Sequence, residues 1–232
     1  MNLIYVILIA VGLFIVLILA GLAVVNYSGE EMYEKYKQTA NVYSNISALE
    51  FANKIINTLF FGEIVIEERL GLFCDCYISS GKLVLSQNYS RENNLAGLAI
   101  CAHELGHALQ FKNQKEKMKK YAKKLKISKI LSKFITPIII LSIILIFFDK
   151  LFFSLIGLGM AIIIFITALA VKMSTIKIEK EASENAITLL QNYTDLTMPE
   201  IEIANTFLDS AKLTYVADLL KSMLRWTGLT RR

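Results

Sequence analysis

The segment at residues 99–110, AICAHELGHALQ, decides the fold because it sets an H-E-x-x-H motif inside a stretch with helical apolar spacing. His103 and His107 are four residues apart, so a helix projects both imidazoles from one face toward a single metal ion. Glu104 cannot share that row of ligands, but it can flank the open position of the metal and accept a proton from bound water. The chain has only these 2 histidines, so a chance match to this spacing is rare. The motif predicts a zinc site with Glu104 as its catalytic residue.

A catalytic zinc ion commonly takes three protein ligands and keeps one position open. Because the chain has no third histidine, the third ligand should be a carboxylate or, as the weaker alternative, a cysteine. Glu179, Glu181 and Glu184 lie close together in the sequence. Helical periodicity puts Glu181 and Glu184 on a face with lysines at i,i+4 spacing, whereas Glu179 shares its face with small residues that let another helix approach. We therefore predict Glu179 as the third ligand, against the alternative of a surface glutamate.

Three apolar runs around these motifs exclude a purely soluble protein and a disordered one. Of the 232 residues, 55% are apolar, and no charge interrupts residues 3–25, 134–148 or 151–171. The first and third runs are long enough to cross a bilayer core of about 30 Å at about 1.5 Å per residue. We expect the first run to be an uncleaved anchor. The other two, joined by Asp149 and Lys150, should form a membrane hairpin.

The net charge of +5 is unevenly distributed. The segment between Lys112 and Lys133 carries 10 of the 25 basic residues and one acid, Glu116, which gives it +9 and leaves −4 for the rest. Such a distribution does not suggest a nucleic-acid partner. Because basic loops stay in the cytoplasm, we expect a multi-pass protein of the cell membrane whose active site faces the cytoplasm. We also expect the segment from Lys112 to Lys133 to contact anionic lipids.

These patterns predict an α+β fold, namely a zincin-like metallopeptidase domain with transmembrane helices. Residues 50–61 and 93–111 should be helical, and residues 64–66, 72–78 and 82–86 should form strands, the last two as a hairpin. The expected segments are an anchor at 1–26, a cytoplasmic domain with the motif helix and a basic helix at 27–133, the hairpin at 134–172 and a helical part at 173–232 that completes the zinc site. Residues 207–229 are apolar but charged, so we expect a helix packed on the domain or lying in the membrane interface.

The cysteines give a weaker signal. Cys74, Cys76 and Cys101 are too few, and odd in number, for a disulfide framework. We expect reduced thiols, with Cys74 and Cys76 as soft metal ligands the less favoured alternative.

Three segments, AICAHELGHALQ, KIEKEASENAI and TYVADLL, together resemble the YugP-like family of membrane zinc metallopeptidases over nearly the whole chain. The chain more distantly resembles HtpX-like membrane proteases, whose third zinc ligand is the first Glu of an E-x-x-A-D segment. That ligand corresponds to Glu179. Ser183 stands where those proteases have Asp, and Cys76, after Asp75, stands where YugP-like relatives often have His. The resemblance implies a bound Zn²⁺ and peptidase activity.

The combined prediction is a membrane-anchored zinc-dependent endopeptidase that hydrolyses peptide bonds with a zinc-activated water. We expect protein or peptide substrates, among them membrane proteins, to pair with the edge of the hairpin at Lys82–Ser86. One alternative is a zinc hydrolase of a non-peptide substrate. The other is a catalytically inactive membrane scaffold or lipid-binding protein with a vestigial zinc site, against which an intact Glu104 argues. Oligomeric state does not follow from the sequence.

Overall fold

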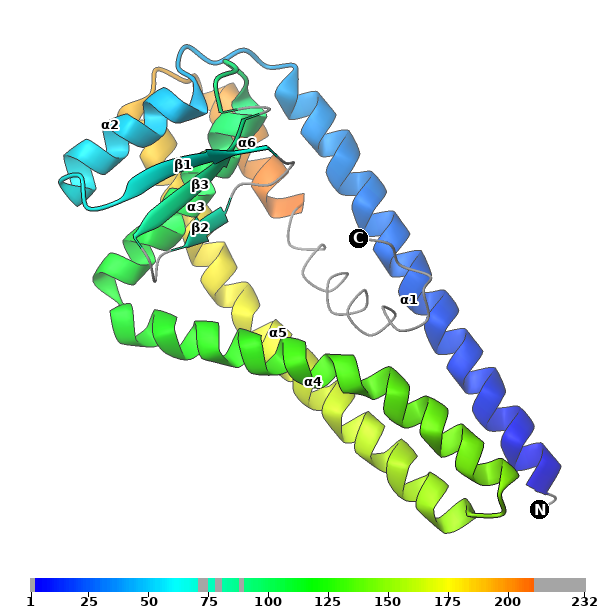
Figure 1. The fold of residues 1–232 in the computed structure, drawn as a ribbon. Helices are drawn as coiled ribbons and strands as arrows, with labels where there is room; N and C mark the ends of the chain where they lie inside the picture. The colour runs from blue at the N-terminus through cyan, green and yellow to red at the C-terminus, as the bar shows by residue number, and fades with distance from the viewer. Residues whose placement is uncertain (1–2, 71–74, 78–80, 88–89, 211–232) are drawn as a thin grey trace. The chain divides into compact units, whose positions relative to one another are not determined.

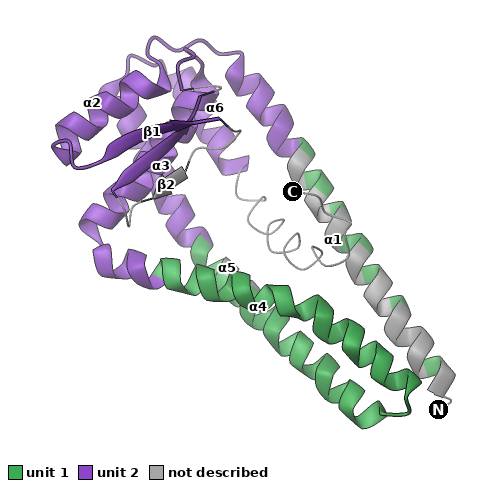
Figure 2. Ribbon diagram, in the orientation of Figure 1, with its two compact units in different colours: residues 1–30, 121–175, 213–232 green, residues 31–120, 176–212 purple. Residues whose placement is uncertain are grey.

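The computed structural model describes residues 3–70, 75–77, 81–87 and 90–210 (Figure 1). The chain divides into two compact units (Figure 2). Unit 1 comprises residues 1–30, 121–175 and 213–232, and unit 2 comprises residues 31–120 and 176–212. Three long helices, α1 (Leu3–Ala40), α4 (Lys115–Phe147) and α5 (Leu151–Tyr193), run from one unit into the other. The predicted segment boundaries at residues 26, 133 and 172 therefore fall inside continuous helices.

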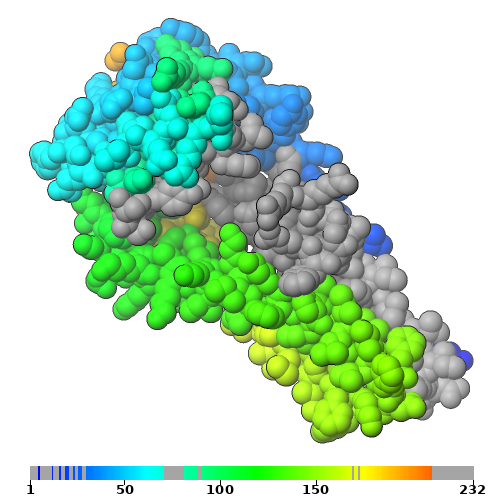
Figure 3. Space-filling view, in the orientation of Figure 1, coloured from blue at the N-terminus to red at the C-terminus, as the bar shows by residue number. Residues whose placement is uncertain are grey.

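Unit 1 contains a helical hairpin built from α4 and α5. Among the described residues, these two helices are long and apolar enough to cross a membrane. Many of their exposed side chains are apolar, and around the turn Phe147, Phe148, Phe152 and Phe153 are between 59% and 70% exposed. Side chains of α4 form much of the light-green surface in Figure 3. Since exposed apolar surface of this extent is unfavourable in water, the hairpin suits a lipid environment.

Small residues let the two helices of the hairpin approach closely. A Cβ atom added to Gly157 of α5 would lie 2.1 Å from the Ser142 hydroxyl of α4. The Ser128 hydroxyl donates to the Ala168 carbonyl across the same contact at 3.3 Å. Such small and hydroxyl-bearing residues are typical of contacts between membrane helices, because they allow backbones to come together without a hydrophobic driving force.

Unit 2 contains a three-stranded sheet of β1 (Val65–Arg69), β2 (Asp75–Tyr77) and β3 (Lys82–Ser86). The strand order is β1-β3-β2, with β1 parallel and β2 antiparallel to β3. The predicted hairpin of the last two strands is confirmed. The prediction that Lys82–Ser86 offers a free edge is wrong, because β3 is the central strand and its backbone pairs on both sides.

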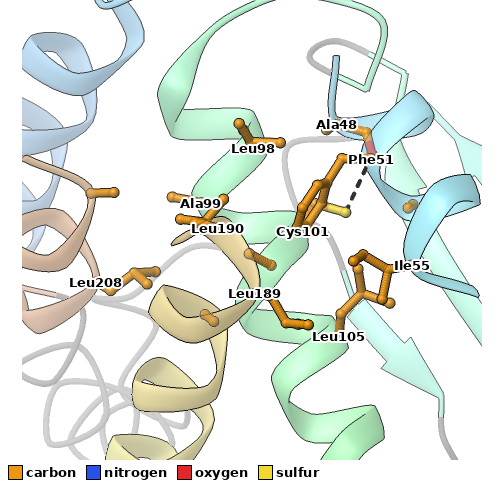
Figure 4. Packing of buried hydrophobic residues seen from close by; sticks show 14 of the residues in the cluster. Ala48, Phe51, Ile55, Leu98, Ala99, Cys101, Leu105, Leu189, Leu190 and Leu208 are labelled. Atoms are coloured by element: carbon orange, nitrogen blue, oxygen red, sulfur yellow. Dashed lines mark hydrogen bonds between the residues drawn. The ribbon is translucent and has the colours of Figure 1, made fainter. Parts of the chain in front are cut away.

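Two helices predicted by the sequence form the centre of unit 2, and in the structure a polar side chain caps the start of each. Helix α2 (Ala48–Phe60) starts with a capping box in which Ser47 and Glu50 exchange hydrogen bonds. Helix α3 (Leu95–Asn113) starts where the Asn94 side chain accepts from the amide of Gly97. Because α3 is buried against several neighbours, apolar residues surround much of it (Figure 4). The buried thiol of Cys101 joins this core and donates to the Ala48 carbonyl at 3.4 Å.

Helix α6 (Met198–Ser210) completes the core of unit 2. Its Phe207 is buried, and the ring lies 6.3 Å from the ring of Tyr36 in α1. Of the ambiguous segment at 207–229, residues 207–210 thus belong to a helix packed on the domain. The remainder lies outside the described residues.

Candidate metal centre

The candidate site forms where α5 crosses α3. At this crossing a Cβ atom added to Gly106 would lie 2.3 Å from the carbonyl oxygen of Ala182, so only glycine permits the observed approach. Asn185 of α5 also donates to the Gly106 carbonyl, at 3.4 Å. The glycine between the two histidines of the motif therefore allows a second helix to come within reach of them.

The close approach brings one carboxylate of α5 to both histidines of α3. Glu179 Oε2 lies 3.4 Å from His103 Nε2 and 3.1 Å from His107 Nε2. The three side chains are 11–13% exposed, so the cluster is nearly buried but still reachable. Among the described residues, His103, His107 and Glu179 are the group that could hold a metal ion, with ligand atoms within 4.8 Å of one another.

The spacing of these donor atoms fits zinc. Two ligands that each lie about 2.0–2.1 Å from one tetrahedral ion are about 3.3 Å apart. The separations of 3.1 and 3.4 Å from Glu179 to the two histidines match this value. Two imidazoles and one carboxylate also form a known donor set for catalytic zinc, which leaves a fourth position open.

The electrostatic environment favours a cation between these groups. Burial lowers the pKa of His107, but the hydrogen bond and charge of Glu179, together with the charge of Glu104, outweigh burial and raise that pKa to about 9. The negative charges that favour a proton on His107 equally favour a divalent metal ion. Glu104, which lies between the two histidines in the sequence of α3, is half-buried.

Two residues that are not among the predicted site residues contact the histidines at Nδ1, the ring nitrogen that does not face Glu179. Gln110 Oε1 lies 3.0 Å from His107 Nδ1, and the Ser183 hydroxyl lies 3.2 Å from His103 Nδ1. Ser183 thus makes a hydrogen bond although it stands in place of the Asp of HtpX-like proteases. A signal for Gln110 was present, because residues three apart on a helix are neighbours and Gln110 follows His107 by three.

The other two glutamates of the cluster point elsewhere. Glu181 accepts from Gln114 at 2.8 Å and pairs with Lys117 at 3.1 Å. Glu184 is exposed and lies 3.6 Å from Lys180. Both carboxylates therefore have partners away from the histidines.

The cysteine alternative finds no support at this site. Cys101 is buried in the core rather than at the metal-binding cluster. Cys74 lies outside the described residues, and of Cys76 the structure describes only the backbone, in β2.

Comparison with known proteins gives two matches. Residues 6–230 match the model of a family described as "Putative neutral zinc metallopeptidase". The chain is also 26% identical over 215 residues to "Putative membrane protease YugP" of Bacillus subtilis, which covers 91% of this chain and 92% of that protein. No solved structure matches.

Proposed function

The chain belongs to this family of neutral zinc metallopeptidases, so zinc is its expected metal, and from this premise we propose that it is a membrane-anchored zinc-dependent endopeptidase. The family membership agrees with the resemblance drawn from the three sequence segments. The observation that carries the proposal is the convergence of His103, His107 and Glu179, with Glu104 near enough for its charge to raise the pKa of His107. A purely structural zinc site needs no such additional carboxylate. We further propose that unit 2, with its motif helix beside a small mixed sheet, is a zincin-like domain.

In the proposed mechanism, His103, His107 and Glu179 would hold zinc, which would lower the pKa of water and polarise a carbonyl group. The Glu104 carboxylate accepts a proton from the attacking water and then passes it to the leaving amine. Gln110 and Ser183 orient the imidazoles through contacts with their Nδ1 atoms. The half-buried position of Glu104 allows contact with a bound substrate while limiting exchange with bulk water.

The corrected strand order changes where an extended substrate would bind. Since both sides of β3 are paired, the edges that the described part of the sheet offers to a peptide are those of β1 and β2. Strand β2 packs against α3, the helix that carries the motif. We propose that the substrate backbone pairs with the outer edge of β2 (Asp75–Tyr77).

We expect the detergent-solubilised protein to cleave an unstructured substrate such as casein, and to do so only when loaded with zinc. Removal of the metal with a chelator should abolish cleavage because the remaining residues cannot polarise the peptide carbonyl, and added Zn²⁺ should restore it. The measurement is cleavage rate beside zinc content per chain.

A protein that binds about one zinc per chain but cleaves no peptide would favour the alternative of a non-peptide hydrolase. Absence of bound zinc would exclude both hydrolases and leave the vestigial site. These results separate the candidate functions without knowledge of the natural substrate.

The membrane placement is the second part of the proposal. The relative's name describes a membrane protease, and α4 and α5 are apolar enough to span. Before its apolar part, α4 carries the exposed lysines Lys123, Lys124, Lys126 and Lys129. We propose that this segment faces the cytoplasm, where it contacts anionic lipids, and that unit 2 with its active site lies on the same side. Membrane proteins and their juxtamembrane tails are then the nearest substrates.

Single cysteines introduced into a chain without Cys74, Cys76 and Cys101 test this orientation. With an impermeant thiol reagent on intact cells, Lys150→Cys in the turn of the hairpin should label, whereas Lys119→Cys should label only after permeabilisation. Both positions are exposed in the structure, so access across the membrane alone should decide the result. The reverse pattern would place the active site outside the cell.

A further inference from the structure

A buried glutamine links the two helices that supply the metal ligands. Gln110 of α3 is 2% exposed and contacts His107 with one end of its amide and the Ile178 carbonyl of α5 with the other. Ile178 directly precedes Glu179. We propose that Gln110 is a positioning residue that fixes the proton of His107 on Nδ1 and leaves Nε2 free for the metal. The proposal rests on the zinc site of the proposed function, but not on peptidase activity.

The first step concerns the orientation of the amide. Gln110 Nε2 lies 2.8 Å from the backbone oxygen of Ile178. A backbone carbonyl can only accept a hydrogen bond, so the NH₂ group must face Ile178. Rotation of the amide by 180° would set two acceptors against each other in a buried place, which is costly. The amide oxygen of Gln110 therefore faces His107.

The orientation of the Gln110 amide in turn determines which nitrogen of His107 carries the hydrogen. Gln110 Oε1 lies 3.0 Å from His107 Nδ1 and can only accept, so Nδ1 must carry the hydrogen. In a neutral imidazole the other nitrogen then bears the lone pair. That nitrogen, Nε2, is the atom that lies 3.1 Å from Glu179 and faces the proposed metal position. The carbonyl of one helix thus determines, through Gln110, which nitrogen of His107 can bind a metal.

His103 shows the contrast. Its Nδ1 contacts the Ser183 hydroxyl at 3.2 Å, and a hydroxyl can either donate or accept. This contact orients the ring but leaves both tautomers open. Gln110 therefore has a role at His107 that Ser183 does not have at His103.

Zinc titration against a competing chelator, on the full-length protein in detergent, tests the proposal with Gln110→Met and Gln110→Glu. Methionine keeps the volume but makes neither hydrogen bond, so zinc affinity should fall about 10–100-fold, the usual cost of losing a hydrogen-bond partner of a metal ligand. Glutamate keeps an acceptor for Nδ1–H and loses the donors of the amide to the Ile178 carbonyl and to Glu181, so zinc affinity should stay within about tenfold of wild type.

Gln114→Met is the matched control, because Gln114 also ties α3 to α5, through Glu181, but contacts no histidine. Its zinc affinity should be unchanged, and the metal-free protein should lose thermal stability about as much as in Gln110→Met. The proposal would be overturned if Gln114→Met lost as much zinc affinity as Gln110→Met, or if Gln110→Glu and Gln110→Met lost it equally. Either result would show that Gln110 only connects α3 to α5. If Gln110→Met does not fold, Gln110→Glu with retained zinc supports the proposal, and Gln110→Glu without zinc refutes it. Failure of the wild type to bind zinc would instead refute the proposed function.

Discussion

Replacing Glu104 with glutamine should leave zinc bound and lower the rate of peptide cleavage by about 10²–10⁴-fold, the range that general acid–base catalysis contributes. Glutamine has the size of glutamate but cannot accept the proton of the attacking water. The ligands His103, His107 and Glu179 remain in place, so zinc affinity should change little. The measurement is cleavage rate beside zinc content in the same preparations.

Glu116→Gln provides the comparison for this variant. Glu116 lies in the first turn of α4, is 77% exposed and pairs only with Lys119 among the ion pairs of the described residues. Its substitution removes the same charge from a nearby part of the chain and should leave cleavage at the wild-type rate. Near-normal cleavage by Glu104→Gln would show that another group takes the proton. Loss of zinc from Glu104→Gln would show instead that Glu104 helps to hold the metal.

Local sequence signals were sufficient for the helices and the hairpin of unit 2. The predicted helices at 50–61 and 93–111 agree with α2 and α3 to within two residues. Ser47 and Asn94 are good capping residues, so the helix starts are specified by neighbours in sequence. The antiparallel pair β2–β3 is likewise local, because only four residues separate the two strands in the sequence.

The parallel pairing of β1 with β3 could not be derived in the same way. Parallel strands need a long connection, and here β2 lies between them in sequence but at the edge in space. No periodicity within β1 or β3 specifies that partner. The same nonlocal contact explains why the substrate edge was placed on the wrong strand.

In the candidate site, too, the sequence predicted the relations within one helix but not the contacts between helices. The spacing of His103 and His107 alone predicts that they share a helix face, and the structure places both there. The partner of Glu181, in contrast, was expected at i,i+4 on its own helix, whereas the structure pairs it with Lys117 of α4. Contacts between helices depend on how the chain folds back, which a periodic pattern within one helix does not contain.

Replacing Glu179 with alanine should lower zinc affinity by more than the roughly 10–100-fold that loss of an indirect partner costs, because a direct ligand is removed. Two histidines would remain, which is too few for a tight zinc site. Glu179 is the one carboxylate of its cluster that lies within 3.4 Å of both imidazoles. The measurement is zinc titration against a competing chelator.

Glu181→Ala and Glu184→Ala are the matched controls, since each removes a carboxylate from the same helix within five residues. Consecutive residues on a helix are rotated by about 100°, so Glu179 and Glu181 point in nearly opposite directions. The contacts agree with this geometry: Glu181 is held by Lys117 and Gln114, and Glu184 lies beside Lys180. Neither control should change zinc affinity, although Glu181→Ala should cost some stability because it removes a tie between α4 and α5. Retained zinc in Glu179→Ala, with loss in either control, would mean that the third ligand is misassigned and that the crossing of α3 and α5 differs from the one described.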